Sequence, residues 1–319
     1  MTEKRYNIAK TFNVEADASL DVVGYAEDHP MVPKQHPYFF RKDMLGDELA
    51  WWSGYDGQSE KEALFFWGPT GSGKTSLWLQ TAARLKIPTH ATTGHMTMEF
   101  SDLVGMKTLI DGDVLWQDGV LTSAMRYGHP CMINEVDAIR PEVLIGLNDI
   151  LDGAPLVLTE NGGEIVNAQP GFRVIFTGNT AGNGDVSGGY QGTMRMNAAF
   201  RDRCVFIYVG YTEKDSERKL MSKALSHIPE EVHNLFFDKM IDVANHVRDR
   251  YENKNGETPL DVTFSTRTLL RWARMVWYYR GLPATNGDPV HYALDRALGF
   301  STDSVTRQSL HEITQKVFG

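Results

Sequence analysis

The feature that most constrains the fold of this chain is the segment 63–80, ALFFWGPTGSGKTSLWLQ. A run of apolar and aromatic residues suited to a buried strand gives way to a glycine-rich turn and then to a helix-forming segment. Gly68, Gly71 and Gly73 allow the backbone to curl so that successive N–H groups point inward. The helix that follows directs the positive end of its dipole at the same point. This arrangement predicts a phosphate-binding loop.

The loop matches G-x-x-x-x-G-K-[ST] at every defined position. In this motif the lysine, here Lys74, reaches the β- and γ-phosphates, and the hydroxyl of Thr75 binds Mg²⁺. The residues expected to bind ATP are Gly68, Pro69, Thr70, Gly71, Ser72, Gly73, Lys74, Thr75 and Ser76. The alternative, a merely flexible loop, leaves the lysine and the threonine to chance.

The composition is that of a globular protein, with 42% hydrophobic and 23% charged residues. No apolar run approaches the roughly 20 residues of a membrane helix, and MTEKRYNIAK does not resemble a signal peptide, so we expect a cytoplasmic protein without membrane insertion. Cys131 and Cys204 are flanked by apolar residues, which favours buried thiols over a disulfide or a zinc site. A net charge of −9 argues against nucleic acid as a partner, although a local basic pore is compatible with it.

Segments after the loop predict an α/β fold with a parallel sheet. A second short strand at 86–93 follows the first helix and completes a βαβ unit, which places the nucleotide at the carboxyl ends of the strands. Asp111-Gly112 lies between two short β-type runs and predicts a hairpin. A second hairpin is predicted to turn at 161–163.

Changes of pattern along the chain predict three parts. Residues 1–37 are expected to form an N-terminal arm, residues 38–211 an αβα nucleotide-binding domain, and residues 212–319 a helical lid domain. The aromatic residues just before the loop, among them Trp51 and Trp52, belong either to the wall of an adenine pocket or to an ordinary core.

A second motif with catalytic chemistry follows the short apolar strand 131–133. At its end Glu135 is the expected general base, because a carboxylate there polarises water for attack on a γ-phosphate. Asn134 occupies the position of the usual aspartate that holds the hydration shell of Mg²⁺. Its amide oxygen accepts hydrogen bonds but carries no charge, which predicts slower hydrolysis or weaker Mg²⁺ binding. Asp137 either compensates for this loss or caps a helix start.

Further candidates lie at strand and helix ends. Thr177 and Asn179 end the buried strand in FRVIFTGN, and each either contacts the γ-phosphate and water or caps a turn. Arg201 and Arg203 precede another β-rich run, where an arginine either reaches the nucleotide of a neighbouring subunit or is simply solvated. Arg267 opens a helix of the lid domain and is placed to bind phosphates from there.

The phosphate loop, I-N-E, T-G-N, R-D-R and F-S-T-R occur in this order before a helical tail, and together they resemble the AAA+ ATPases. One hairpin interrupts a helical segment and another precedes T-G-N, as in the helix-2-insert clade, which includes MoxR-type ATPases. FSDLVG, NEVDAIRPEV, GNGDVSGGYQGT and FSTRTLLRWA most resemble the small AAA+ subunit of cobaltochelatase (CobS-like). The likeness covers roughly residues 33–280.

This resemblance implies an AAA+ αβα domain with two β-hairpin insertions and a smaller helical lid. It also implies a homohexameric ring with ATP and Mg²⁺ between subunits, and often a partner protein with a von Willebrand factor A domain. The hairpins resemble elements that face the pore or the client. By matching motif, Lys74 and Thr75 bind nucleotide and Mg²⁺, and Glu135 is the catalytic base. Asn179 is the first sensor and Arg267 the second sensor. Arg203 is the arginine finger that acts in trans.

The expected function is therefore a ring-forming ATPase that acts as a chaperone or remodelling motor on a protein partner. One alternative is the ATPase subunit of cobaltochelatase, which inserts cobalt during cobalamin biosynthesis. Another is a nucleic-acid motor, which the acidic composition disfavours. A third is an ATP-gated scaffold with weak hydrolysis, which Asn134 favours.

Overall fold

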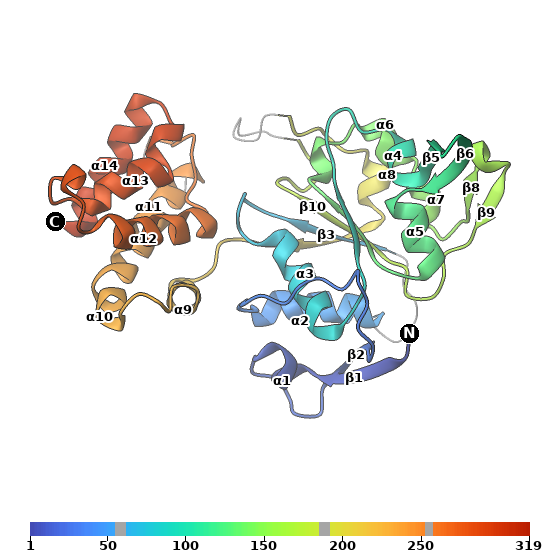
Figure 1. The fold of residues 1–319 in the computed structure, drawn as a ribbon, viewed down its shortest axis with the longest axis horizontal. Helices are drawn as coiled ribbons and strands as arrows, with labels where there is room; N and C mark the ends of the chain where they lie inside the picture. Colours follow the sequence, from blue (N-terminus) through green and yellow to red (C-terminus); the bar gives the residue numbers. More distant parts are fainter. Residues whose placement is uncertain (55–61, 185–191, 253–257) are drawn as a thin grey trace. The chain divides into compact units, whose positions relative to one another are not determined.

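The structure, a computed structural model, describes residues 1–54, 62–184, 192–252 and 258–319. They divide into two compact units (Figure 1). The first unit comprises Met1–His36, Phe40–Pro69 and Gly73–Val209. The second comprises Pro37–Phe39, Thr70–Ser72 and Gly210–Gly319.

A five-stranded sheet in the order β11-β3-β10-β7-β4 forms the centre of the first unit, and all its strand pairs are parallel. Its strands are β3 (Ala63–Trp67), β4 (His90–Thr93), β7 (Cys131–Asn134), β10 (Val174–Gly178) and β11 (Cys204–Tyr208). β3, β7 and β10 are apolar along nearly their whole length because both faces of the sheet are covered. The predicted parallel sheet is confirmed.

Helices cover both faces of this sheet (Figure 1). On one side lie α2 (Lys42–Ser53) and α3 (Lys74–Leu85). On the other lie α4 (Phe100–Val104), α5 (Val120–Tyr127), α6 (Pro141–Ile145), α7 (Asn148–Leu151) and α8 (Ala198–Arg201). On this second side Phe65, Ile133 and Phe176 of the sheet join Leu121 and Phe200 of the helices in one fully buried cluster. Burial of each such side chain contributes about 1.5–3 kcal/mol.

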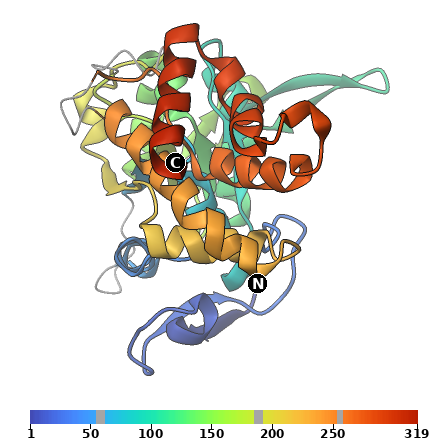
Figure 2. The ribbon, with the colours of Figure 1, turned by 90° about the vertical axis from the view of Figure 1, so that its left-hand side faces the viewer.

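Both predicted hairpins are present. β5 (Gly105–Ile110) pairs with β6 (Asp113–Asp118), and β8 (Leu156–Leu158) pairs with β9 (Glu164–Val166), each antiparallel. Asp111 and Gly112 have φ of 51° and 95°, the backbone that a tight hairpin turn requires. The 3-10 turn η2 (Thr159–Asn161) begins the second turn. Figure 2 shows the β5–β6 hairpin, in teal, extending well beyond the helices around it.

Residues Met1–His36, the expected N-terminal arm, belong to the first unit. β1 (Glu3–Asn7) and β2 (Asp21–Tyr25) form an antiparallel pair joined through α1 (Ile8–Phe12). A Cβ on Gly24 would lie 2.3 Å from the carbonyl oxygen of Leu85, so β2 packs closely against the end of α3. Trp51 is fully buried with its ring edge-on to Trp78, which agrees with the core alternative for this aromatic residue.

The second unit is helical. It contains α9 (Lys214–Ala224), α10 (Glu230–Val232), the π-helical turn η3 (His233–Phe237), α11 (Asp238–Tyr251), α12 (Thr266–Tyr279), α13 (Pro289–Ala297) and α14 (Ser304–Phe318), with short 3-10 turns at η4 (Pro283–Thr285) and η5 (Gly299–Ser301). α13 was not predicted, although Asp288 caps it and Pro289 occupies its first position. Among the residues that the structure describes, no helix has the length and apolar character needed to span a membrane.

Candidate functional site

The phosphate loop leaves β3 after Trp67 and enters α3 at Lys74. Gly68, Gly71 and Gly73 have φ of 146°, 71° and 99°, a region that L-residues rarely adopt. A Cβ on Gly68 would also lie 2.3 Å from the carbonyl oxygen of Val209. The curl of the loop therefore depends on glycine at these positions.

Lys74 is 6% exposed, and its ammonium group is held at the base of the loop. Its Nζ donates to the carbonyl oxygens of Gly68 at 2.8 Å and Pro69 at 3.0 Å, and to Oδ1 of Asn179 at 2.9 Å. Burial lowers the pKa of Lys74 to about 8, although the nearby carboxylates of Glu135 and Asp137 act to raise it. An anionic ligand beside Nζ favours the charged form, so this lysine suits a phosphate.

Asn179, which directly follows β10, links Lys74 to Glu135. Its Oδ1 accepts from Lys74, and its Nδ2 donates to Oε2 of Glu135 at 2.9 Å. The structure thus brings together three predicted site residues that come from the start of α3 and from the ends of β7 and β10. Parallel strands make this possible because their carboxyl ends meet at one edge of the sheet.

Asn134 connects the loop helix with the edge strand. Its Oδ1 accepts from Oγ1 of Thr75 at 2.8 Å and from Oγ1 of Thr177 at 3.2 Å. Its Nδ2 donates to the carbonyl oxygen of Thr92 in β4 at 3.2 Å. An aspartate lacks the amide donor, so the asparagine exchanges a negative charge at the site for a hydrogen bond to β4.

Glu135 has φ of 52°, a left-handed conformation that costs of order 1–3 kcal/mol for a residue with a side chain. Its backbone N–H donates to Oγ1 of Thr177 at 3.2 Å. Thr177 is fully buried and supports both Asn134 and Glu135 from behind. Its burial and these hydrogen bonds disfavour the alternative in which Thr177 contacts the γ-phosphate or water.

Asp137 has a role that was not predicted from the sequence. Its carboxylate is 1% exposed, and Oδ2 accepts from the backbone N–H groups of Asn179 at 2.7 Å and Thr180 at 3.0 Å. At this burial it is not an exposed helix cap, and its other oxygen, Oδ1, is buried without a hydrogen-bond partner among the described residues. Instead it holds the end of β10, and thereby the backbone of Asn179. These partners lie 42 and 43 residues further along the chain, so no local pattern reveals them.

Arg203 lies at the opposite edge of the sheet, where the strands begin. Its carbonyl oxygen accepts from the N–H of Ala63, the first residue of β3, whereas the phosphate loop follows the last. A five-residue strand spans about 16 Å. The guanidinium binds both carboxylate oxygens of Asp152 at 2.7 Å. Within one chain, therefore, Arg203 does not join the cluster around Lys74.

The other predicted residues also lie apart from that cluster. Arg201 donates to Oδ1 of Asn183. Arg267 is the second residue of α12, is exposed, and belongs to the second unit. In the predicted glycine-rich loop GNGDVSGGYQGT, residues 185–191 lie outside the described part of the chain.

The residues of the loop fit ATP with Mg²⁺. Ser72 Oγ is buried and has no hydrogen-bond partner among the described residues, as expected of a group that serves a ligand. Lys74 supplies the cation, and the oxygens of Thr75 and Asn134 are hard donors of the kind Mg²⁺ prefers. The described residues contain no group of three His, Cys, Asp or Glu side chains arranged to hold a metal, and Mg²⁺ in such sites is typically held by few protein ligands together with phosphates.

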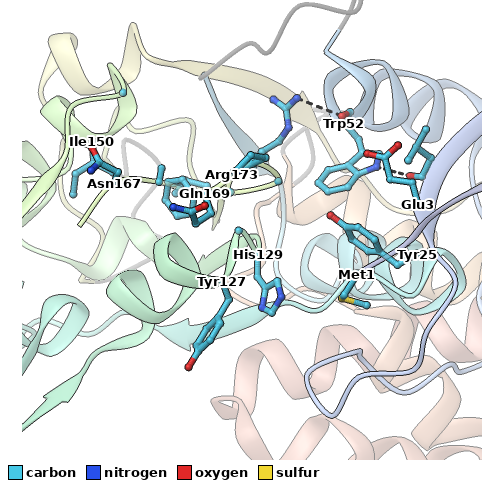
Figure 3. A pocket seen from close by; sticks show the side chains of 18 of the residues that line it. Met1, Glu3, Tyr25, Trp52, Tyr127, His129, Ile150, Asn167, Gln169 and Arg173 are labelled. Carbon is cyan, nitrogen blue, oxygen red and sulfur yellow. Dashed lines mark hydrogen bonds between the residues drawn. The ribbon is translucent and has the colours of Figure 1, made fainter. Parts of the chain in front are cut away.

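A separate cavity of about 790 Å³ opens near the amino ends of the strands (Figure 3). Arg173 and Val174, at the start of β10, line it together with Tyr25, Trp52 and His129. None of the predicted nucleotide-site residues lines this cavity. It is therefore distinct from the phosphate loop at the other edge.

Two protein families match the chain, one on each side of the boundary between Val209 and Gly210 that separates the two units. Residues 63–204 match the AAA domain (dynein-related subfamily), and residues 223–317 match the CbbQ/NirQ/NorQ C-terminal domain. The aerobic cobaltochelatase subunit CobS of a Sinorhizobium species is 25% identical over 98% of this chain and 90% of its own length. An uncharacterized protein of Staphylococcus haemolyticus is 35% identical over 46% of this chain and 55% of its own length. The chain thus spans about half the length of this staphylococcal relative.

Two structures of RuvB mutants from Thermotoga maritima share the fold. One is 16% identical with a TM-score of 0.51 and covers 88% of this chain and 78% of its own. The other is 15% identical with a TM-score of 0.50 and covers 83% and 73%. At this identity the likeness concerns the fold alone. With two domain matches in the expected order and a full-length relative in CobS, the chain belongs to the AAA+ ATPases, in their MoxR/CobS-like group.

Proposed function

We propose that this protein hydrolyses ATP in a ring of identical subunits and uses the energy to remodel a protein partner. The observation that carries the proposal is the hydrogen-bonded series from Lys74 through Asn179 to Glu135, beside Thr75 and Asn134. A buried ammonium group, an amide side chain and a carboxylate thus lie together at the end of the phosphate loop.

In this proposal the loop residues 68–76 bind the phosphates of ATP, and Thr75 and Asn134 hold hydrated Mg²⁺. When bound, ATP supplies the phosphoryl group and Mg²⁺ neutralises charge on its oxygens. Glu135 accepts a proton from the attacking water. Asn179 keeps this carboxylate in place through the 2.9 Å hydrogen bond to Oε2.

The position of Arg203 supports catalysis across subunits. Because it lies at the edge of the sheet opposite Lys74, an arginine finger at this position acts on the nucleotide of a neighbour. Its two hydrogen bonds to Asp152 hold the guanidinium in a defined direction. A homohexamer is the assembly that we propose, as in the family.

Exposed apolar pairs on the two hairpins support the proposal that the protein acts on a protein partner. Leu109 and Val114 face each other across β5–β6 and are 70% and 66% exposed. Val157 and Ile165 do the same across β8–β9, at 51% and 61%. Exposed apolar side chains are typical of protein contact surfaces, and the β5–β6 hairpin extends beyond the helices around it (Figure 2). We propose that these hairpins contact the client or a partner with a von Willebrand factor A domain.

Size-exclusion chromatography with and without ATP and Mg²⁺ tests the ring. We expect a hexamer-sized species that ATP stabilises, and we expect Lys74→Ala to abolish the effect of ATP because the buried cation is lost. A wild-type protein that elutes as a monomer in both conditions contradicts the proposal.

A second candidate is the ATPase subunit of a cobaltochelatase, which the full-length similarity to CobS favours. Cobalt insertion measured with the partner subunits of such an enzyme distinguishes it from a motor with another client. A third candidate is a nucleotide-gated scaffold. It rests on Asn134, and the turnover of the wild-type protein decides it.

A further inference from the structure

A buried ion pair lies inside the second unit. Glu217 of α9 and Arg248 of α11 are 0% and 3% exposed. Nη1 and Nη2 of the arginine donate to the two carboxylate oxygens at 2.7 and 2.8 Å. Both charges are thus removed from water and paired in a planar, bidentate geometry.

Both members of this pair also hold the segment that opens α12. Nε of Arg248 donates to the carbonyl oxygen of Phe264 at 2.7 Å, and Oγ1 of Thr266 donates to Oε1 of Glu217 at 2.7 Å. Between them Ser265 caps the helix by accepting from the N–H of Thr268. The pair therefore fixes the residue before the cap and the first residue of the helix.

Further contacts restrict the guanidinium itself. It lies 4.3 Å from the centre of the Tyr211 ring, and Nη1 also donates to Oδ1 of Asn245 at 2.9 Å. A buried ion pair is a weak source of net stability, because an apolar pair of similar volume often packs as well or better. Its geometry serves instead to define direction, and the element that it directs is the start of α12.

We propose that Glu217 and Arg248 are positioning residues for Arg267, the residue that follows Thr266. This inference rests on the proposed function and on the role of second sensor that the resemblance to AAA+ ATPases implies for Arg267. Arg267 is exposed and has a long side chain, so the anchored backbone of the first helical turn determines where its guanidinium acts. The hydrogen bond from the Thr266 hydroxyl to the Glu217 carboxylate connects the ion pair to this turn.

Thr266→Val tests this link with little risk to folding, because it removes the hydroxyl and leaves the ion pair. Thr314→Val is the matched control: it removes a fully buried hydroxyl in the same unit, one that donates to the carbonyl oxygen of Leu310 in its own helix. We expect Thr266→Val to lower kcat/KM for ATP about tenfold or more, the effect of a hydrogen bond to a charged group. Thr314→Val should stay within about twofold of the wild type. Thermal unfolding of both variants checks that each is folded.

A double-mutant cycle with Arg267→Ala separates positioning from general destabilisation. If Thr266 acts through Arg267, adding Thr266→Val to Arg267→Ala lowers kcat/KM by less than about twofold. The inference is overturned if Arg267→Ala impairs hydrolysis while Thr266→Val does not, or if the two losses multiply; the proposed ATPase then still stands. If the wild type shows no ATP hydrolysis, the proposed function fails and the inference fails with it.

Discussion

The carboxyl edge of the parallel sheet, where the strands end, and the amino edge, where they begin, differ in the arrangement of their polar groups. At the carboxyl edge Lys74, Asn179 and Glu135 form one hydrogen-bonded series, and Asp137 fixes its backbone from behind. At the amino edge a cavity opens beside His129 (Figure 3), whose Nδ1 lies 3.1 Å from Nε2 of His90.

Burial shifts pKa values at both edges, but only at the carboxyl edge do nearby opposite charges counteract the shift. Burial lowers the pKa of Lys74 to about 8, and the carboxylates of Glu135 and Asp137 counteract the shift. Burial also lowers the pKa of His129 to about 4, and there His90 adds to the shift. The carboxyl edge therefore keeps charges available for chemistry, whereas the amino edge keeps its imidazoles neutral. If this contrast is correct, variants at the first edge change ATP turnover and variants at the second change stability.

The largest effect is expected from Glu135→Gln. The amide still accepts a hydrogen bond from Asn179 but takes no proton from water, so steady-state ATP turnover should fall about a hundredfold or more. Nucleotide affinity, measured by titration with a fluorescent analogue, should change little. Glu142→Gln, at an exposed position in the first turn of α6, is the control. Equal turnover in wild type and Glu135→Gln would remove Glu135 as the base.

Asp137→Asn should have an intermediate effect on both turnover and stability. The neutral amide is a weaker acceptor for the N–H groups of Asn179 and Thr180, so the free energy of unfolding should fall by about 1–3 kcal/mol. Turnover should fall about tenfold because Asn179 is less firmly placed. Urea unfolding and steady-state kinetics measure the two effects, with Asp113→Asn at the exposed start of β6 as control. Loss of stability at unchanged turnover would show that Asp137 serves the fold alone.

The smallest effect on catalysis is expected at the amino edge, from His129→Gln. Turnover at neutral pH should stay within about twofold of the wild type, because His129 does not touch the cluster around Lys74.

His129 should instead act on the pH dependence of stability. Its folded pKa of about 4 lies below the unfolded value of about 6.5. Between these values the unfolded state binds more protons, so wild-type stability falls as the pH falls. His129→Gln should flatten that loss in urea unfolding at pH 7 and pH 5, whereas the exposed His227→Gln should not. A large drop in turnover would contradict the separation of the two edges.

Patterns within short segments predicted much of this molecule. The glycines of the phosphate loop, the apolar strands and the Asp111-Gly112 turn are all local, and each appears where it was expected. The strand pair β1–β2, which packs against α3, was not predicted because the polar composition of the first residues hides it. α13 follows a segment with loop composition and was not predicted, although Asp288 and Pro289 are ordinary start signals for a helix.

The sequence by itself determined that a phosphate loop follows a buried strand, because glycine, lysine and threonine must stand next to one another there. Only the tertiary structure decided which side chains from other parts of the chain lie next to Lys74. Asn179 lies 105 residues from Lys74 and 44 from Glu135, and it reaches both because parallel strands end at one edge of the sheet. The same geometry makes Asp137 the support of that edge, through the N–H of Asn179, and places Arg203 at the other edge, beside the first residue of β3.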